Sequence, residues 1–254
     1  MHGLNTYDYG ARQYNPVTAR WDRMDPLCEK YYSTSPYAYC LNNPVRLVDP
    51  NGEDVTIIYT DENGKTQTFI FDGTQSKCPN NSYVLAFIKT YNFLKSKGLG
   101  KNLVKAVTDH KYNIRLQNDN DGQGNAYSYT LNRVFWDPSH GKKLTNGGKQ
   151  SVAVALEHEF DHAISYNDDP NGYKNRRKQY DSQYDNAEER RVIEGSEKQT
   201  ATTLNEGIRH NHKGDYYMTI MPTSTKEGIP HNFRRSRPVP NKPSLIQFIE
   251  NLFH

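Results

Sequence analysis

The chain has 254 residues, a formal net charge of +3 at pH 7 and 34% hydrophobic residues, a share that includes 19 tyrosines. This length allows one large or two smaller domains, but the low apolar content predicts a thin core, with long polar loops or a segment that completes its fold elsewhere. The 32 basic and 29 acidic residues nearly balance, which gives no argument for nucleic-acid binding, and the lack of a run of 18 apolar residues argues against a membrane helix.

The cysteines and the first residues bear on the compartment in which the protein works. Cys28, Cys40 and Cys78 have neither the number nor the spacing of a disulfide framework or a zinc knuckle, so we expect reduced, mostly buried thiols. The first ten residues lack the basic and apolar regions of a cleaved signal peptide. If the protein leaves its cell, we therefore expect export without such a peptide.

Residues 1–53 differ from the rest in being dense in Tyr, Asp, Asn, Arg and Pro. Asp-Pro and Asn-Gly pairs predict turns there, and the short Tyr-rich pieces between them are typical of strands. Four phrases cover residues 4–52 almost continuously: YDYGARQYNP, ARWDRMDP, SPYAYCLNNPVR and VDPNG. With these phrases in this order, the segment closely resembles the C-terminal end of the Rhs (YD-repeat) core.

The resemblance implies a biological setting. Proteins of this family build a β-rich shell around a variable C-terminal toxin. It therefore implies manufacture in the bacterial cytoplasm, delivery to a target cell, an upstream Rhs shell, a protein substrate in that cell and a cognate immunity protein. Many relatives end the core in a DPxGL self-cleavage motif, whereas residues 49–53 read DPNGE without the leucine, so a simple turn is an equal alternative.

From residue 54 to residue 254 the pattern becomes that of an α+β domain. Two β-rich runs around the loop at 61–64 predict a hairpin over 55–71. Ser82 is a possible cap and Gly98 a stop for the first helix. The next expected elements are a helix at 101–108, a strand at 112–116, a loop at 118–125 and a strand or hairpin arm at 127–136. Near the C-terminus, a Pro-rich basic stretch at 222–243 could cover a cleft, act as a linker or be disordered. A terminal helix is expected at 242–253.

The clearest chemical signal is His158-Glu159-Phe160-Asp161-His162 in residues 151–164, which predict a mostly buried helix because they are apolar and lack Gly and Pro. His158 and His162 are four residues apart, so both imidazoles lie on one face of the helix and can reach one Zn²⁺. Glu159 follows the first ligand and is placed to take a proton from a bound water. The sequence therefore predicts a zinc metallopeptidase site with Glu159 as its catalytic residue.

A catalytic zinc takes a third protein ligand and leaves its fourth position for water. In the expected helix at 187–197, Glu189 falls in the middle of an inward stripe that contains Val192 and Ile193, whereas Glu188 lies about 90° away. A glutamate on an apolar face is costly unless it is paired or bound to a metal. We therefore prefer Glu189 as the third ligand and keep Glu188 as an alternative.

Asp168 is the rival third ligand. Residues 158–168 read HEFDHAISYND, which resembles the HExxHxxGxxD pattern of some metzincin-like proteases. Those chains turn sharply at the glycine, but Ser165 stands at that position here.

Residues 132–217 also resemble the HExxH effector-type peptidases found as C-terminal domains of Rhs toxins, through the phrases FWDP, LEHEFDHA and EERRVIEGSE. The resemblance implies a zincin-like domain with His158, His162 and a downstream glutamate on zinc and Glu159 as the catalytic group. It does not identify the substrate. The oxyanion of the reaction needs a nearby donor, and the candidates are Arg209, His210, His212 and Tyr217.

Two other functions compete with a peptidase toxin. One is a non-catalytic Rhs surface or adhesion remnant whose metal is structural or absent. The other is a nuclease toxin, although no further His/Asp/Glu constellation in the sequence competes with residues 158–162. Glu159 distinguishes a peptidase from a scaffold, because a structural zinc site needs no carboxylate beside its first ligand and is closed by a fourth protein ligand.

Overall fold

The computed structural model describes residues 55–74, 78–109, 111–118 and 124–228, together with positions 7, 8, 13–15, 17, 18, 20–24, 35 and 37. The chain divides into two compact units, Met1–Glu53 and Asp54–His254. Several expectations lie outside the described residues: Cys28 and Cys40, the DPNGE segment, most of the Pro-rich stretch and the terminal helix.

The described part of the first unit is a small antiparallel sheet in the order β1-β2-β3. The first two strands lie in a Tyr-rich piece, as the sequence predicts, whereas the third lies in the following segment without Tyr, where Trp21 is buried. The strands are β1 (Tyr7–Asp8), β2 (Gln13–Asn15) and β3 (Arg20–Trp21).

The second unit is a mixed α/β domain with a five-stranded sheet in the order β5-β4-β6-β8-β7. β4 and β5 form the expected hairpin, β6 pairs in parallel with β4 and β8, and β7 is antiparallel to β8. The run at 127–136 is two short strands of a hairpin, because the chain turns at Asn132, which adopts a φ of 45°. The strands are β4 (Val55–Thr60), β5 (Thr66–Phe71), β6 (Arg115–Gln117), β7 (Ala126–Ser128) and β8 (Arg133–Phe135).

Two helices precede the central part of this domain, α1 (Ser82–Ser96) and α2 (Lys101–Thr108), and both confirm the predicted positions. The predicted cap is wrong by one residue: the Asn81 side chain, rather than Ser82, accepts hydrogen bonds from the first backbone N–H groups of α1. Gly98 follows α1 with a φ of 68°, the left-handed conformation that ends many helices.

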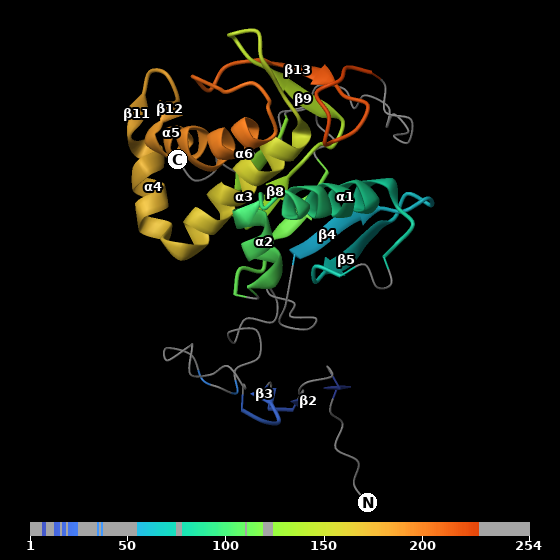
Figure 1. The fold of residues 1–254 in the computed structure, drawn as a ribbon. Helices are drawn as coiled ribbons and strands as arrows, with labels where there is room; N and C mark the ends of the chain where they lie inside the picture. The colour runs from blue at the N-terminus through green and yellow to red at the C-terminus, as the bar shows by residue number, and fades with distance from the viewer. Residues whose placement is uncertain are drawn as a thin grey trace, which may run out of the picture. The chain divides into compact units, whose positions relative to one another are not determined.

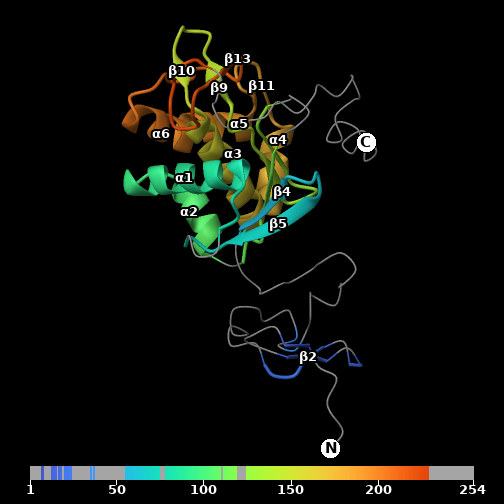
Figure 2. The same ribbon diagram turned by 90° about the vertical axis from the view of Figure 1, so that its right-hand side faces the viewer.

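The helix α3 (Val152–Asp168) carries His158 and His162 through the centre of the domain. In both views it lies between the five-stranded sheet with α1 and α2 on one side and four later elements on the other (Figure 1, Figure 2): β9 (His140–Lys143), α5 (Ala187–Val192), α6 (Lys198–Thr203) and β13 (Asp215–Met218). It is buried on nearly every side from Val152 to Ile164, which confirms the predicted burial. Burying each large apolar side chain contributes about 1.5–3 kcal/mol, so this packing stabilises the position of α3.

The remaining elements pack around α3, and Tyr173, on the helix that follows α3, also contacts Tyr127 of the sheet. The helix expected at 187–197 is interrupted, because Gly195 leaves helical geometry and the chain passes through a π-helical turn, η3 (Ile193–Glu197). The strand β9 pairs with β10 and β13. These elements are β9 (His140–Lys143), β10 (Lys149–Gln150), α4 (Pro170–Lys178), β11 (Tyr180–Asp181), β12 (Asp185–Asn186), α5 (Ala187–Val192), α6 (Lys198–Thr203) and β13 (Asp215–Met218).

Within the described residues, none of the helices combines the length and the apolar character that crossing a membrane requires. The one cysteine that the structure describes, Cys78, is a half-buried free thiol.

Candidate metal centre

The two histidines of α3 meet at their Nε2 atoms. His158 and His162 are each 4% exposed, and their Nε2 atoms are 3.1 Å apart. The helical spacing of four residues stacks the rings on one face, as the sequence predicts. Two imidazole nitrogens this close, each able to offer a lone pair, are an arrangement that a shared cation stabilises.

The helix α5 brings Glu189 to this pair. The side chain of Asn186 caps α5 by accepting from the N–H groups of Glu188 and Glu189. Glu189 Oε2 lies 3.3 Å from His158 Nε2, and Glu189 Oε1 lies 3.3 Å from His162 Nε2. The ligand atoms of these three residues all fall within 4.8 Å of one another, so the group could hold a metal ion.

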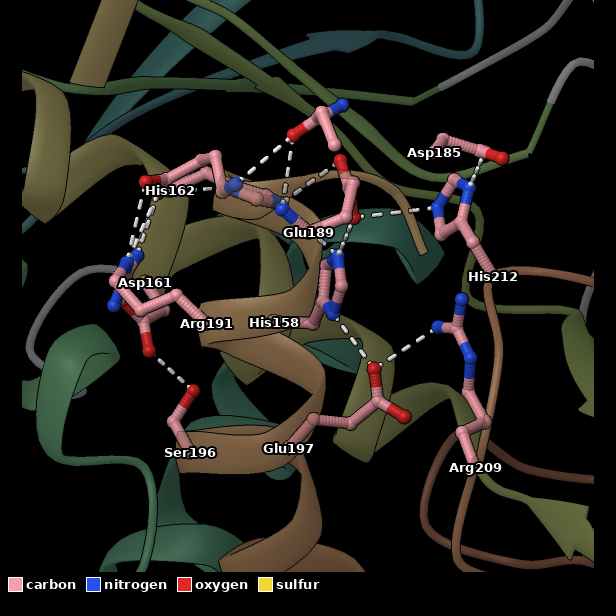
Figure 3. A network of polar contacts seen from close by, with 12 residues as sticks. His158, Asp161, His162, Asp185, Glu189, Arg191, Ser196, Glu197, Arg209 and His212 are labelled. Atoms are coloured by element: carbon pink, nitrogen blue, oxygen red, sulfur yellow. Dashed lines mark hydrogen bonds and ion pairs between the residues drawn. The ribbon is translucent and has the colours of Figure 1, made fainter. Parts of the chain in front are cut away.

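The Nδ1 atom of His158 is held by Glu197. The Nδ1–Oε2 distance is 2.7 Å, and Glu197 also accepts from Arg209 Nη1 at 2.9 Å and from Gln150 Nε2 at 2.9 Å. Figure 3 shows Glu197 between His158 and Arg209. Burial would raise the pKa of Glu197, but the hydrogen bond from His158 and the charge of Arg209 outweigh it and lower that pKa.

Glu188 accepts from the Nδ1 atom of His162, as Glu197 accepts from that of His158. His162 Nδ1 lies 3.2 Å from Glu188 Oε1, and Arg176 Nε and Arg191 Nη2 bind the same carboxylate at 2.5 and 2.7 Å. Burial would raise the pKa of Glu188, but His162 and the two guanidinium groups hold it well below its usual range. The structure therefore places Glu188 on the ring nitrogen of His162 that faces away from the histidine pair, and not among the ligand atoms.

Asp168, the rival third ligand, is far from the pair. It is the last residue of α3 and pairs with Lys105 at 2.7 Å and Lys111 at 3.0 Å, and Tyr112 Oη donates to it at 3.0 Å. The reason is that α3 stays helical through Ser165, where a glycine would be needed to turn the chain back. Six more helical residues after His162 carry the chain about 9 Å along the axis.

Glu159 lines a cavity of about 190 Å³ next to the histidine pair. Its side chain is largely buried, at 7% exposure. Burial raises the pKa of its carboxyl group, while His158 and His162 act against this shift and Glu189 acts with it. The other residues that line the cavity are Asn125, His140, Lys142, Gln150, Ser151, Ala155, His158, Glu197, Arg209, His212 and Tyr216.

Two of the four oxyanion candidates line this cavity, His212 and Arg209. His212 Nε2 lies 3.3 Å from Glu189 Oε2, while its Nδ1 pairs with Asp185 Oδ2 at 2.5 Å (Figure 3). The side chain of His210 is exposed, and Tyr217 Oη points instead at the backbone oxygen of Gln150, 3.2 Å away.

Sequence reasoning missed Asp185, Glu197 and Lys142. Glu197 carried little signal, because eight residues place it about 80° from Glu189 around a regular helix, and the chain passes through a π-helical turn before it. Asp185 and Lys142 carried none, since their approach to the site depends on how a hairpin and a strand pack against α3.

The donor set fits a divalent cation. Glu189 Oε2 is buried, and its contacts at 3.3 Å with the Nε2 atoms of His158 and His212 do not have the geometry of hydrogen bonds. An unsatisfied buried carboxylate oxygen is costly, and a cation shared with two imidazoles would satisfy it. Because both Nδ1 atoms donate to carboxylates, both Nε2 atoms are left with their lone pairs directed at the same place.

Comparisons with known proteins add little to the geometry. No family model matches the chain, and no solved structure matches it significantly. A stretch of 47 residues, 18% of this chain, is 47% identical to salivary gland surface protein 1 of Aedes aegypti, and it spans about 1% of the length of that relative. The functional conclusion therefore rests on the site itself.

Proposed function

We propose that residues 54–254 form a zincin-like zinc metallopeptidase domain that hydrolyses peptide bonds of a protein in a target cell. The observation that carries the proposal is the meeting of buried His158 and His162 with half-buried Glu189 beside a cavity that Glu159 lines. Two imidazoles and one carboxylate are a ligand set of catalytic zinc, which keeps its fourth position for water or substrate.

In this proposal His158, His162 and Glu189 hold Zn²⁺, which when bound supplies Lewis acidity, lowering the pKa of a water and polarising a peptide carbonyl. Glu159 takes a proton from the attacking water as the new C–O bond forms. It then gives that proton to the amide nitrogen, and the C–N bond breaks to release an amine and a carboxylic acid. Glu197 and Glu188 act through the histidines by fixing the orientation of their rings.

We assign to His212 the stabilisation of the negative charge that develops on the carbonyl oxygen. Asp185 accepts from Nδ1 and fixes the ring on the cavity wall, beside Glu189. His212 donates from Nε2 to an oxyanion when its ring is an imidazolium, and hydrogen bonds of this kind are a large source of stabilisation in acyl-transfer reactions. Burial and the charges of Arg209 and Lys142 lower the pKa of His212, so this form depends on the opposing charge of Glu189 and the hydrogen bond to Asp185.

The competing reading is a scaffold whose metal is structural. A structural zinc site is closed by a fourth protein ligand, whereas the candidate group among the described residues has three members. Glu159, which such a site would not need, lines the adjoining cavity. Both observations favour an enzyme over an adhesion remnant.

The biological setting belongs to the same proposal. The Rhs-like phrases in residues 4–52 support a C-terminal toxin that is made in the bacterial cytoplasm and delivered from an upstream Rhs shell. Such a toxin requires a cognate immunity protein in its producer.

The test combines metal analysis with expression of the wild type and Glu159→Gln in a susceptible bacterium. We expect both proteins to bind one zinc ion, and the variant to lose toxicity and to cleave proteins of the bacterial lysate about 10²–10⁴-fold more slowly. Glu62→Gln, at an exposed turn, is the matched control and should behave as the wild type. Absence of bound zinc, or full activity of Glu159→Gln, would falsify the proposal.

A further inference from the structure

The cavity beside the metal group, the three residues His158, His162 and Glu189, contains a buried guanidinium with one nitrogen that makes no hydrogen bond to a described residue. Arg209 is 8% exposed, its Nη1 donates to Glu197 at 2.9 Å, and its Nε donates to the backbone oxygen of Asn211 at 3.3 Å. Its Nη2 is also buried but has no hydrogen-bond partner among the described residues. Leaving a charged donor unpaired away from water is costly, so this nitrogen indicates a place for an acceptor that the protein does not itself supply.

A second cation borders the same cavity. Lys142, on β9, is half-buried and lines the cavity together with Arg209 and Glu159. Its ammonium lies 5.6 Å from the centre of the Tyr216 ring, and none of the described carboxylates pairs with it. Burial and the positive charge of Arg209 lower the pKa of Lys142 to about 8, and the charges of Glu197, Glu159 and Glu189 only partly offset this shift. An anion between the two cations would relieve this repulsion.

The acidic side chains that line the cavity do not fill this role. Glu197 already bridges His158 and Arg209, and Glu159 stands beside the metal group. The groups in this part of the cavity that still lack a hydrogen-bond partner in the part of the chain that the structure describes are therefore donors, Arg209 Nη2 and the Lys142 ammonium. Their natural partner is a negatively charged acceptor.

We propose that Arg209 and Lys142 form an anion subsite that receives a carboxylate of the peptide substrate. The inference rests on the proposed function, since it places this subsite beside the bond to be cleaved. A guanidinium nitrogen and an ammonium are both good partners for a carboxylate. The carboxylate can come from an acidic side chain or from the C-terminus of the peptide, and the two sources differ in where cleavage falls.

The test measures binding without turnover, on zinc-loaded Glu159→Gln protein. The probes are fluorescein-labelled peptides with four alanines on each side of a central Glu, Gln or Lys and with an amidated C-terminus. A further peptide has central Gln and a free C-terminal carboxylate. Fluorescence anisotropy gives the dissociation constants, and we expect a peptide with a carboxylate to bind about 10-fold more tightly than the amidated Gln peptide.

Substitutions at Lys142 show whether the preference arises at this subsite. Lys142→Gln should abolish it, Lys142→Arg should retain it, and Lys142→Glu should favour the peptide with central Lys. Lys143→Gln is the control, because the neighbouring Lys143 pairs with Glu227 at 3.0 Å and does not line the cavity. It should leave the preference unchanged.

Each outcome has a separate meaning. Preference for the central-Glu peptide assigns the subsite to an acidic side chain, and preference only for the free C-terminus assigns it to the terminal carboxylate. Equal or undetectable binding of all peptides, or a preference that survives Lys142→Gln, overturns the inference. Zinc content and cleavage by the wild type are measured independently, so a failed peptidase proposal is distinguishable from a failed subsite.

Discussion

The carboxylates behind His158 and His162 decide what these two residues can do. Glu197 and Glu188 accept from the Nδ1 atoms, which fixes the tautomer and points both Nε2 lone pairs at one place. Burial alone would lower the pKa of His162, but Glu189 and Glu188 raise it well above its usual value. A cation bound by His158, His162 and Glu189 would take the place of the extra proton on His162, because an imidazole that binds a metal is neutral.

His212 is the residue whose role the structure makes testable. We expect His212→Phe to lower kcat about 10²–10³-fold because it removes a donor to the developing oxyanion. Asp185→Asn should also lower kcat, but by a smaller factor, because the His212 ring is retained and only loses its charged partner. Zinc content should not change in either variant. His210→Phe, at an exposed position, is the control, and zinc loss from His212→Phe would identify His212 as a ligand instead.

At the scale of elements, α3 is anchored by the residue that precedes its first histidine. Glu157 accepts from Asn102 N at 3.0 Å, Leu103 N at 3.1 Å and Asn102 Nδ2 at 2.9 Å. These backbone N–H groups belong to the first turn of α2, whose N-cap Gly100 has no side chain to satisfy them. Glu157 therefore joins α2 to α3, while His158, Glu159 and His162 on the same helix build the site.

Glu157 also makes stability depend on pH. Burial raises its pKa from the usual 4.5 to about 7, so the folded state favours the protonated carboxyl. This contribution is complete below pH 4.5 and is lost as the pH rises to 7, by up to about 3 kcal/mol. We expect the free energy of unfolding of the wild type, relative to Glu157→Gln, to fall over this interval in urea titrations. A pH-independent difference would contradict the assignment.

The second unit as a whole is held by a core that wraps α3. Trp136, Phe87 and Phe160 are fully buried, and Trp136 Nε1 donates to the backbone oxygen of Val152 at 3.2 Å. His158 and His162 lie on α3 and Glu189 lies on α5, so a metal ion held by these three residues would link two elements of the unit.

Removing the metal should therefore lower the stability of the whole unit. At a free zinc concentration 1,000 times the dissociation constant, binding contributes about 4 kcal/mol. For a domain of this size, that corresponds to a fall in Tm of about 8–16 °C on adding a chelator. Calorimetry checks this, with Glu159→Gln showing the same shift as the wild type and Glu189→Gln showing almost none. An unchanged Tm in the chelated wild type would argue against a metal that bridges α3 and α5.

Several elements were predictable because their signals are local. The hairpin β4–β5 and the helices α1 and α2 follow from runs of periodic residues and from turn residues between them. The strand at 112–116 was less well placed, since β6 is Arg115–Gln117 and its extent is set by pairing with β4 and β8. The interruption of the helix after Val192 depends on Gly195, a residue that the helical pattern alone does not distinguish.

The sequence by itself determined that His158 and His162 share a helix face with Glu159 beside them, because helical periodicity is a property of five consecutive residues. Only the tertiary structure decided that Glu189, and not Asp168 or Glu188, joins them, because that depends on how α5 packs against α3 and on α3 running straight past Ser165. The meeting of Arg209 with Lys142 was decided in the same way, since residues distant in sequence are brought to one cavity by packing, which leaves no periodic trace in the chain.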